Sequence, residues 1–247
     1  MKVNWHNRFV QQAAWTRDLR DYLYQRAGLS AARHVLEVGC GTGVLLAELL
    51  ERIQNRVVGV DLEMTRVQAS AINAPQAGLV QADGQNLPFL SGAFDLAVCH
   101  FLLLWVKKPA LLLKEMQRVT RQGGAVLALA EPDYGGRIDY PDALIDLGKQ
   151  QKQSLEIQGA DPLIGRKLNG LFHQAGFREI ETGVLGAQWS QPPTKDDLDQ
   201  EWAVLQDDLR DLLDQQEIEK MRSLEINSWE RGERVLFVPT FYAWGRV

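Results

Sequence analysis

Cysteine is nearly absent from this sequence, which contains two in 247 residues. Two thiols cannot form the set of disulfides that holds many small secreted domains together, and the spacing of Cys40 and Cys99 fits no common metal-binding motif. We therefore expect no metal site and treat both cysteines as small packing residues. The chain is long enough to bury a sizeable core without such cross-links.

Long apolar runs and long runs of one charge are also missing. No apolar stretch approaches the ~18 residues of a membrane-spanning helix, and the first eight residues lack the apolar core of a signal peptide. The longest basic run is Lys107-Lys108, in a chain of 27 basic and 32 acidic residues with a net charge of −5. The composition predicts a cytoplasmic protein without a membrane partner, and it argues against a nucleic-acid partner.

The most informative stretch is Val35-Leu-Glu-Val-Gly-Cys-Gly-Thr-Gly43, an apolar segment followed by three glycines at alternate positions. A second apolar run, 44–50, comes directly after it. This order predicts a buried strand, a tight turn and a helix. Glycine permits positive φ and lets a ligand approach the main chain more closely than any Cβ would allow. The sequence therefore predicts a ligand site at the carboxyl end of a buried strand.

Two classes of ligand use such a turn, and the glycine spacing separates them. A dinucleotide fingerprint requires G-x-G-x-x-G/A, but here the third glycine comes one residue early and Val44 stands where a small residue is needed. The stretch instead resembles motif I of the class I S-adenosylmethionine-dependent methyltransferases, which is an acidic residue, one apolar residue and then G-x-G-x-G. Glu37, Gly39, Gly41 and Gly43 fill every position of that motif.

Two further strand ends carry the resemblance, which covers about residues 30–180. The apolar segment 56–61 ends in Asp61, about 20 residues after the turn, where this family and other nucleotide-binding sheets bind ribose hydroxyls. We expect Asp61 to face solvent when no ligand is bound, and a helix cap is its alternative role. The segment 78–84 ends in Asp83 and Gly84, and the pattern A-D-G-x-x-L-P-F resembles the family's adenine contact.

The resemblance implies that S-adenosylmethionine is the cofactor and S-adenosylhomocysteine the product. Within the family, the chain is similar to the small-molecule branch that serves ubiquinone and menaquinone biosynthesis. The cofactor-binding residues that the resemblance implies are Glu37, Gly39, Cys40, Gly41, Gly43, Asp61, Leu62, Asp83, Gly84 and His100.

Two later strand ends supply candidates for the substrate side of the site. His100 follows the apolar segment 94–99, and Glu131, Asp133 and Tyr134 follow the apolar segment 125–130. We take these four as candidate catalytic residues, because methyl transfer requires an aligned nucleophile and, for a hydroxyl or a carbon acid, removal of a proton. Structural roles stay open for a lone His at a strand end and for an Asp in a proline-containing turn.

One turn is missing from the segment that follows residue 99. Enzymes that methylate the amines of bases or of glutamine carry an Asp/Asn-Pro-Pro-aromatic turn there, and Cys99-His-Phe-Leu has no proline. This absence argues against an RNA or protein acceptor. The resemblance to the small-molecule branch implies a small acceptor, which we expect to be partly hydrophobic, with oxygen, nitrogen and carbon all open as the methylated atom. An RNA or protein methyltransferase and a non-catalytic S-adenosylmethionine-binding protein remain as alternatives.

The fold implied by the resemblance is α/β, a doubly wound, mostly parallel seven-stranded sheet of the Rossmann-like methyltransferase type. We expect a single domain, 1–247, made of an N-terminal helical cap (1–30), a cofactor-binding core (31–190), a helical insertion (191–232) and a final strand (233–247). Local patterns further predict a helix 109–121 that ends at a Gly123-Gly124 cap, and an antiparallel edge position for the last strand that tolerates Pro239.

Aromatic residues are dense in the two outer helical segments. We expect them to form a roof over a closed, apolar acceptor pocket. The leucine stripe of the insertion would serve equally well as a dimer contact, so a monomer and a homodimer both stay open. The aromatic residues of the expected roof are Trp5, Trp15, Tyr22, Trp202 and Trp229.

Overall fold

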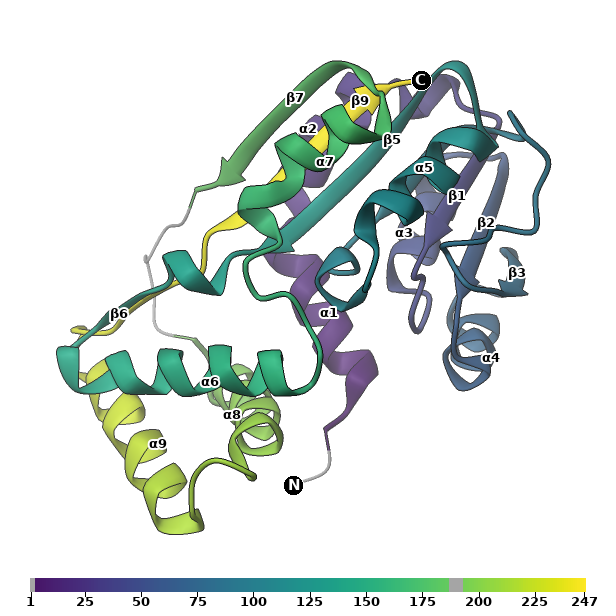
Figure 1. The fold of residues 1–247 in the computed structure, drawn as a ribbon. Coiled ribbons are helices and arrows are strands. Elements are labelled where there is room, and N and C mark those ends of the chain that lie inside the picture. The colour runs from purple at the N-terminus through teal and green to yellow at the C-terminus, as the bar shows by residue number, and fades with distance from the viewer. Residues whose placement is uncertain (1–2, 187–192) are drawn as a thin grey trace.

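A seven-stranded sheet forms the centre of the computed structural model, which describes residues 3–186 and 193–247 (Figure 1). The strands lie in the order β3-β2-β1-β4-β5-β9-β7, and β9 alone runs opposite in direction to the other six strands. The predicted doubly wound, mostly parallel sheet is confirmed. The strands are β1 (His34–Val38), β2 (Arg56–Asp61), β3 (Gly78–Gln81), β4 (Phe94–Cys99), β5 (Thr120–Pro132), β7 (Arg178–Leu185) and β9 (Thr240–Arg246).

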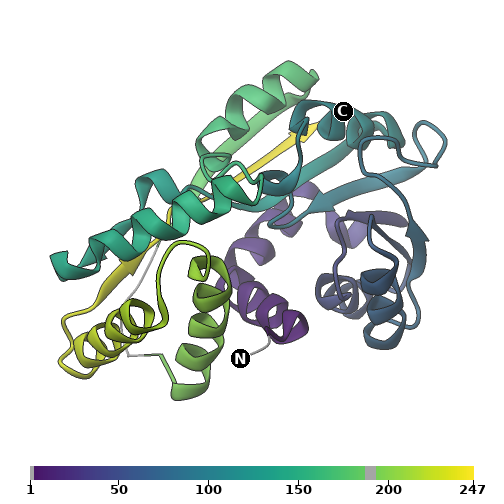
Figure 2. The ribbon, with the colours of Figure 1, turned by 60° about the horizontal axis from the view of Figure 1, so that its bottom comes forward.

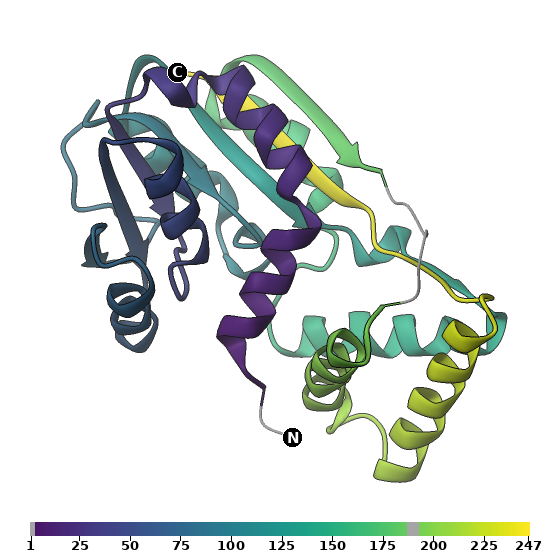
Figure 3. The ribbon, with the colours of Figure 1, turned by 180° about the vertical axis from the view of Figure 1, so that it is seen from behind.

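Helices cover both faces of the sheet because successive strand residues point to opposite sides. Leu36 and Val58 pack with α5 (Pro109–Val119) and α7 (Leu168–Ala175), which lie in front of the sheet in Figure 1. Their neighbours Val35 and Val57 pack with α2 and α3 on the other face, where Figure 3 shows α2 lying along the sheet. The helices of this face are α1 (Trp5–Trp15), α2 (Arg17–Ala27), α3 (Val44–Arg52) and α4 (Met64–Asn73).

A smaller helical lobe extends from one end of the sheet (Figures 1 and 2). It consists of α6 (Ile145–Ile157), α8 (Lys195–Leu209), α9 (Gln215–Glu230) and a two-stranded sheet of β6 (Ile138–Tyr140) and β8 (Val235–Phe237). Leucines of all three helices surround the buried Trp202. A helical insertion before the last strand is confirmed, with helices α8 and α9 inside the expected range 191–232. Residues 191 and 192 of that range lie outside the described residues, as do 187–190 of the expected core.

The predicted glycine cap of the helix 109–121 is wrong. The helix ends at Val119, and the hydroxyl of Thr120 donates to the carbonyl of Met116 at 2.7 Å. The chain then enters β5 directly, so Gly123 and Gly124 are strand residues. A Cβ on Gly124 would lie 2.5 Å from the carbonyl oxygen of Asp95, so glycine there permits the backbones of β4 and β5 to approach closely.

The predicted edge position of the last strand is also wrong. The stretch 234–244 contains two elements, since β8 pairs with β6 in the small sheet and β9 lies between β5 and β7 in the large one. Pro239 falls between β8 and β9. Proline has no N–H to donate to a ladder, so it is tolerated at the point where the chain leaves one sheet for the other.

Candidate functional site

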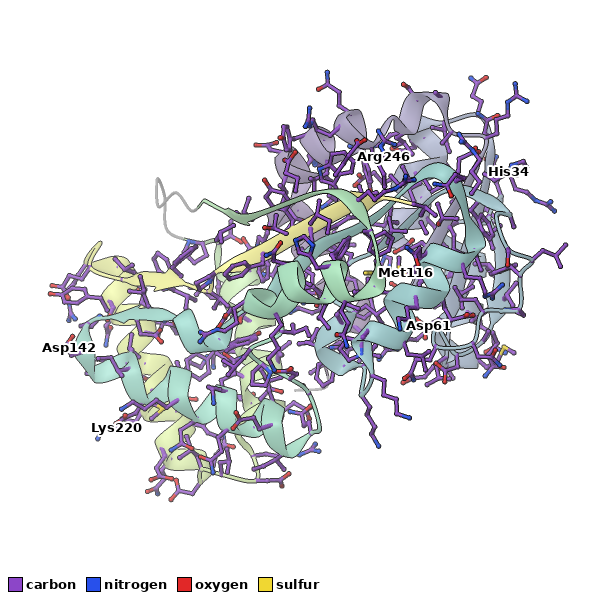
Figure 4. All side chains as sticks on the ribbon, turned by 45° about the horizontal axis from the view of Figure 1, so that its top comes forward. His34, Asp61, Met116, Asp142, Lys220 and Arg246 are labelled. Atoms are coloured by element: carbon purple, nitrogen blue, oxygen red, sulfur yellow. The ribbon has the colours of Figure 1, made fainter. Side chains whose placement is uncertain are left out.

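A cavity of about 640 Å³ lies at the carboxyl ends of β1, β2 and β4, which is within the ~300–1,000 Å³ typical of small-molecule sites. The strand order reverses between β1 and β4, and open α/β sheets bind ligands at such a point. Figure 4 labels Asp61 at this end of β2 and His34 at the opposite end of the neighbouring β1. Residues of α1, α6 and α8 complete the walls of the cavity.

The glycine turn has the backbone conformation that the sequence predicted. Gly39, Gly41 and Gly43 have φ of 75°, 54° and 84°, all in the left-handed region. A Cβ on Gly41 would lie 2.9 Å from Cε2 of Phe9, a residue of α1 that also lines the cavity. The turn therefore presents bare backbone to the cavity, as a closely bound ligand requires.

Asp61 organises this turn from the end of β2. Its carboxylate accepts hydrogen bonds from the backbone N–H of Gly41 at 2.9 Å and of Glu63 at 3.0 Å. The side chain lines the cavity but is only 7% exposed, so the expectation that it faces solvent is wrong. The physical reason is that both oxygens bind main-chain donors, which draws the carboxylate into the turn.

Glu37, the acidic residue of the turn, is buried beside it. It is 3% exposed, it lines the cavity, and its Oε2 has no hydrogen-bond partner among the residues that the structure describes. Burial, followed by the negative charges of Glu48 and Asp61, raises the pKa of Glu37 well above its ordinary value. Because an unpaired buried polar atom is costly, Glu37 fits a site whose ligand supplies a donor or a cation.

The remaining predicted cofactor residues lie along the same cavity, with one exception. Asp83 and Gly84 line it beyond β3, and Leu62 is 65% exposed at its rim. Cys40 is buried, and burial raises the pKa of its thiol. Gly43 does not line the cavity, since it is the N-cap residue of α3 and packs against Ser70. The structure thus brings together nine of the ten residues predicted from sequence.

His100 lines the cavity as predicted, but its environment makes it a poor base. Burial, and then the positive charge of Arg20, lower the pKa of its imidazole to about 3. Its Nε2 lies 2.9 Å from the hydroxyl of Thr16, and that hydroxyl also accepts from Arg20 at 2.6 Å. The imidazole is therefore neutral near pH 7 and already engaged with the junction of α1 and α2.

Glu131 does not line the cavity, contrary to the expectation for an acid at a strand end. Its carboxylate accepts from the backbone N–H groups of Leu102 and Leu103 at 3.0 and 2.9 Å and of Leu104 at 3.3 Å. Burial raises the pKa of Glu131 to about 7, against the effect of these three donors. Glu131 thus holds the loop after β4 in place.

Asp133 is likewise absent from the cavity wall. It forms an ion pair with Arg166 and accepts from the N–H groups of Gly135 and Gly136 at 3.0 and 3.1 Å. Tyr134 is the one member of this group that lines the cavity, and burial raises the pKa of its phenol, so it is a hydrogen-bond donor near neutral pH.

Another part of the cavity wall consists of residues that the sequence did not indicate. Arg8 of α1 is 7% exposed and pairs with Glu201 of α8. Gln151 of α6 and Asp208 of α8 lie in the same part of the cavity. No motif joins these residues, because they come from helices far apart in the chain and meet only after folding.

The predicted aromatic roof is therefore present only in part. Trp5 lines the cavity, whereas Trp15 and Trp229 line a neighbouring cavity of about 930 Å³. Tyr22 instead donates to Glu181 at 2.7 Å on the face covered by α2, and Trp202 is buried within the small lobe. The part of the cavity lined by α1, α6 and α8 includes Arg8, Gln151 and Asp208 and is more polar than the expected apolar pocket.

Across residues 3–186 and 193–247, no three His, Cys, Asp or Glu side chains gather as a metal ion would require. Over the same residues, no helix is both long and apolar enough to cross a membrane.

The fold, the glycine turn and the carboxylates at successive strand ends define a class I S-adenosylmethionine-dependent methyltransferase domain. The family model described as a methyltransferase domain matches residues 36–128, which contain most of the cofactor half of the cavity. Residues 36–128 thus match this family, and S-adenosylmethionine is the cofactor of the domain. The residues present fit that cofactor, since the glycine turn leaves backbone exposed and Glu37 offers an unpaired carboxylate oxygen.

Similar proteins agree with this assignment of the fold. An uncharacterised 37.1 kDa protein of a Streptomyces fradiae transposon is 32% identical over 68% of this chain and 51% of its own length. A ubiquinone biosynthesis O-methyltransferase of Sodalis glossinidius is 31% identical over 43% of this chain and 44% of its own. A crystal structure from Bacillus halodurans, described as a candidate methyltransferase, has a TM-score of 0.63 at 17% identity and covers 93% of this chain and 98% of its own. The chain spans about half the length of the curated relatives it matches.

Proposed function

We propose that this protein transfers the methyl group of S-adenosylmethionine to a small, partly hydrophobic acceptor and releases S-adenosylhomocysteine. The observation that carries the proposal is the unpaired Oε2 of Glu37, which lies beside a glycine turn at the switch point of the sheet. The cofactor supplies a methyl group on a positively charged sulfur, a good leaving group that needs no metal. The protein's task is then to align the acceptor and manage its proton.

The residues of the cavity divide this task between two halves. In the cofactor half, Glu37 would receive the methionyl ammonium, Asp61 the ribose hydroxyls and Asp83 the adenine amine. Gly41 leaves room for the cofactor to contact the main chain. His100, at the end of β4, lies at the border between the halves as a neutral positioning group. Tyr134 and the residues of α1, α6 and α8 would then bind the acceptor.

Several features favour a small acceptor that is methylated on oxygen. The acceptor half is covered by α1 and α8, which contact one another and leave a cavity of limited volume. A relative that is 31% identical is an O-methyltransferase of ubiquinone biosynthesis. We place the enzyme in the cytoplasm, as a monomer or a homodimer, with no nucleic-acid or membrane partner.

The proposal is tested by incubating the protein with methyl-labelled S-adenosylmethionine and three kinds of acceptor: a panel of small phenols, carboxylic acids and amines, total RNA, and mixed proteins. Label in the small molecules alone is the expected result. Label in RNA or protein would replace the proposed acceptor class, and cofactor binding without transfer to any acceptor would indicate a non-catalytic binding protein.

Asp61→Ala is expected to weaken S-adenosylmethionine binding by about 1.5–3 kcal/mol, the usual effect of losing hydrogen bonds to a charged group. The variant should also lose stability, because the N–H groups of Gly41 and Glu63 lose their acceptor. Calorimetric titration measures the first effect and urea unfolding the second. Asp61→Asn is the matched control, because it keeps one carbonyl oxygen for the turn, and unchanged affinity in Asp61→Ala would remove the residue from the site.

The contacts of α1 and α8 also support the helical cap and the insertion as a lid. Arg8 joins the two helices through Glu201, and both helices line the cavity. Hydrogen exchange with and without S-adenosylhomocysteine is expected to show protection gained in 5–16 and 195–209. The helix α2 serves as an internal control, since its Tyr22 lies against Glu181, away from the cavity. Exchange indifferent to ligand, together with a concentration-dependent mass, would instead support the alternative of a dimer contact.

A further inference from the structure

The acceptor half of the cavity contains a carboxylate held in an unusual way. Asp208 of α8 is half-buried and lines the cavity. It accepts hydrogen bonds from the side-chain amides of Gln158 at 3.0 Å and Gln151 at 3.3 Å, one on each oxygen. Across the described residues no Lys, Arg or His forms an ion pair with it. Two neutral amides leave the carboxylate oriented but not neutralised.

The orientation of one of these amides is fixed by a chain of buried groups. Arg137 donates to the carbonyl oxygen of Gln151, so the amide NH₂ of Gln151 must point toward Asp208. Arg137 is itself held by Asp139, and Asp139 by Arg234. This series of hydrogen bonds continues at Glu225, whose carboxylate accepts from Arg234 and from the indole N–H of Trp202.

Buried ion pairs of this kind contribute little to stability on balance, because desolvation opposes their attraction. The two arginines and two carboxylates of this hydrogen-bonded network also cancel one another in charge. Their combined effect is to hold Gln151, 3% exposed, in a single orientation against Asp208. The network therefore serves to position a group in the cavity.

Other titratable groups near the acceptor cannot take up a proton as readily. The pKa of His100 is lowered to about 3, chiefly by burial, and Tyr134 remains protonated because burial raises the pKa of its phenol. Asp207 is exposed and paired with Arg210 at 2.8 Å. By contrast, burial raises the pKa of Asp208 against the effect of its two amide donors.

The charges of this region indicate which acceptor would bind. Among the charged residues of α1, α6 and α8 that line the cavity, Arg8 is neutralised by Glu201 and Asp207 by Arg210, so Asp208 gives these helices an excess negative charge there. An acceptor carrying a carboxylate or a phosphate would be repelled. A neutral molecule with an acidic hydroxyl, such as a phenol or an enol, could instead donate a hydrogen bond to Asp208.

We infer that Asp208, oriented by Gln151 and Gln158, accepts the proton of a neutral phenol or enol as that oxygen is methylated. This inference rests on the proposed function. The acceptor oxygen forms a bond to the methyl carbon, and the carbon–sulfur bond breaks with its electron pair remaining on sulfur. The hydroxyl proton passes to Asp208, so the products are a methyl ether, S-adenosylhomocysteine and a protonated carboxyl group, which then loses its proton to solvent.

The test compares two probe acceptors in the wild type and in Asp208→Asn. Catechol is neutral near pH 7, whereas the acidic hydroxyl of 4-nitrocatechol is already largely ionised. With catechol, kcat is expected to fall by about 100-fold or more in Asp208→Asn, the usual contribution of a positioned base. With 4-nitrocatechol kcat should fall little or rise, because no proton has to be removed and the variant no longer repels the anion. Asp211→Asn, which removes an exposed carboxylate just beyond α8, is the matched control and should leave both rates unchanged.

A pH profile adds a readout that a structural role would not move. In the wild type, catechol methylation should fall as the pH drops through the raised pKa of Asp208, and this limb should be absent in Asp208→Asn. Equal losses with both probes, or no loss, would overturn the inference. So would methylation of amines or carboxylic acids in place of phenols. Failure of the wild type to bind S-adenosylmethionine in calorimetry would instead contradict the proposed function itself.

Discussion

Gly41→Val is expected to abolish S-adenosylmethionine binding. Gly41 has a φ of 54°, in a region that costs about 1–2 kcal/mol for a residue with a Cβ and more for a β-branched one. The new side chain would also meet Phe9, whose ring lies 2.9 Å from the position of the Cβ, and would fill space that the cofactor approaches. Calorimetric titration should detect no binding under conditions where the wild type saturates.

The control for this experiment separates backbone strain from loss of space. Gly28 has a φ of 81°, but nothing lies within 4 Å of the position its Cβ would occupy. Gly28→Val should therefore lower stability and leave cofactor affinity unchanged. If Gly41→Val binds the cofactor as the wild type does, the turn has a structural role only.

Glu37→Leu is expected to have opposite effects on stability and on binding. Removing a buried carboxyl with an unpaired oxygen should raise the thermal unfolding temperature of the ligand-free protein. The same change removes the partner of the cofactor's ammonium, so affinity should fall by about 10- to 150-fold, which corresponds to ~1.5–3 kcal/mol. Glu51→Leu, on the exposed face of α3, should change neither quantity appreciably. Unchanged affinity of Glu37→Leu for S-adenosylmethionine would falsify the role of Glu37 as the partner of the ammonium.

The raised pKa of Glu37 gives this prediction a dependence on pH. Its pKa is higher in the folded chain than in the unfolded one, so its contribution to stability is complete below about pH 4 and is lost as the pH rises through the folded value. Binding of the ammonium requires the ionised form, so affinity should rise with pH over the same range and then level off. Glu37→Gln should show neither trend.

The cofactor half of the cavity could be predicted because its signals are local. The turn at Gly41 follows its strand directly, and Asp61 and Asp83 each stand at the end of the next apolar segment. Parallel strands bring their carboxyl ends to one edge of a sheet, so three local patterns combine into one site without knowledge of any distant contact. The seven-stranded sheet was implied by the resemblance to the methyltransferase family that these patterns carry.

The rule that acids at the carboxyl ends of strands face the ligand failed for Glu131 and Asp133 at the end of β5. The rule does not account for nearby hydrogen-bond donors: the backbone N–H groups of the loop 102–104 bind Glu131, and Arg166 binds Asp133. The acceptor half could not be predicted for a related reason. Asp208 and Gln151 come from helices whose packing depends on the whole small lobe, and no spacing in the sequence joins them.

The most direct test of cofactor binding at this site is a crystal structure of the protein with S-adenosylhomocysteine. We expect the ligand at the carboxyl ends of β1, β2 and β4, with its amino group on Glu37, directly or through one water, its ribose hydroxyls on Asp61 and its adenine beside Asp83. A ligand bound elsewhere, or bound with Oε2 of Glu37 still unpaired and Asp61 free of contact, would contradict the assignment of the site.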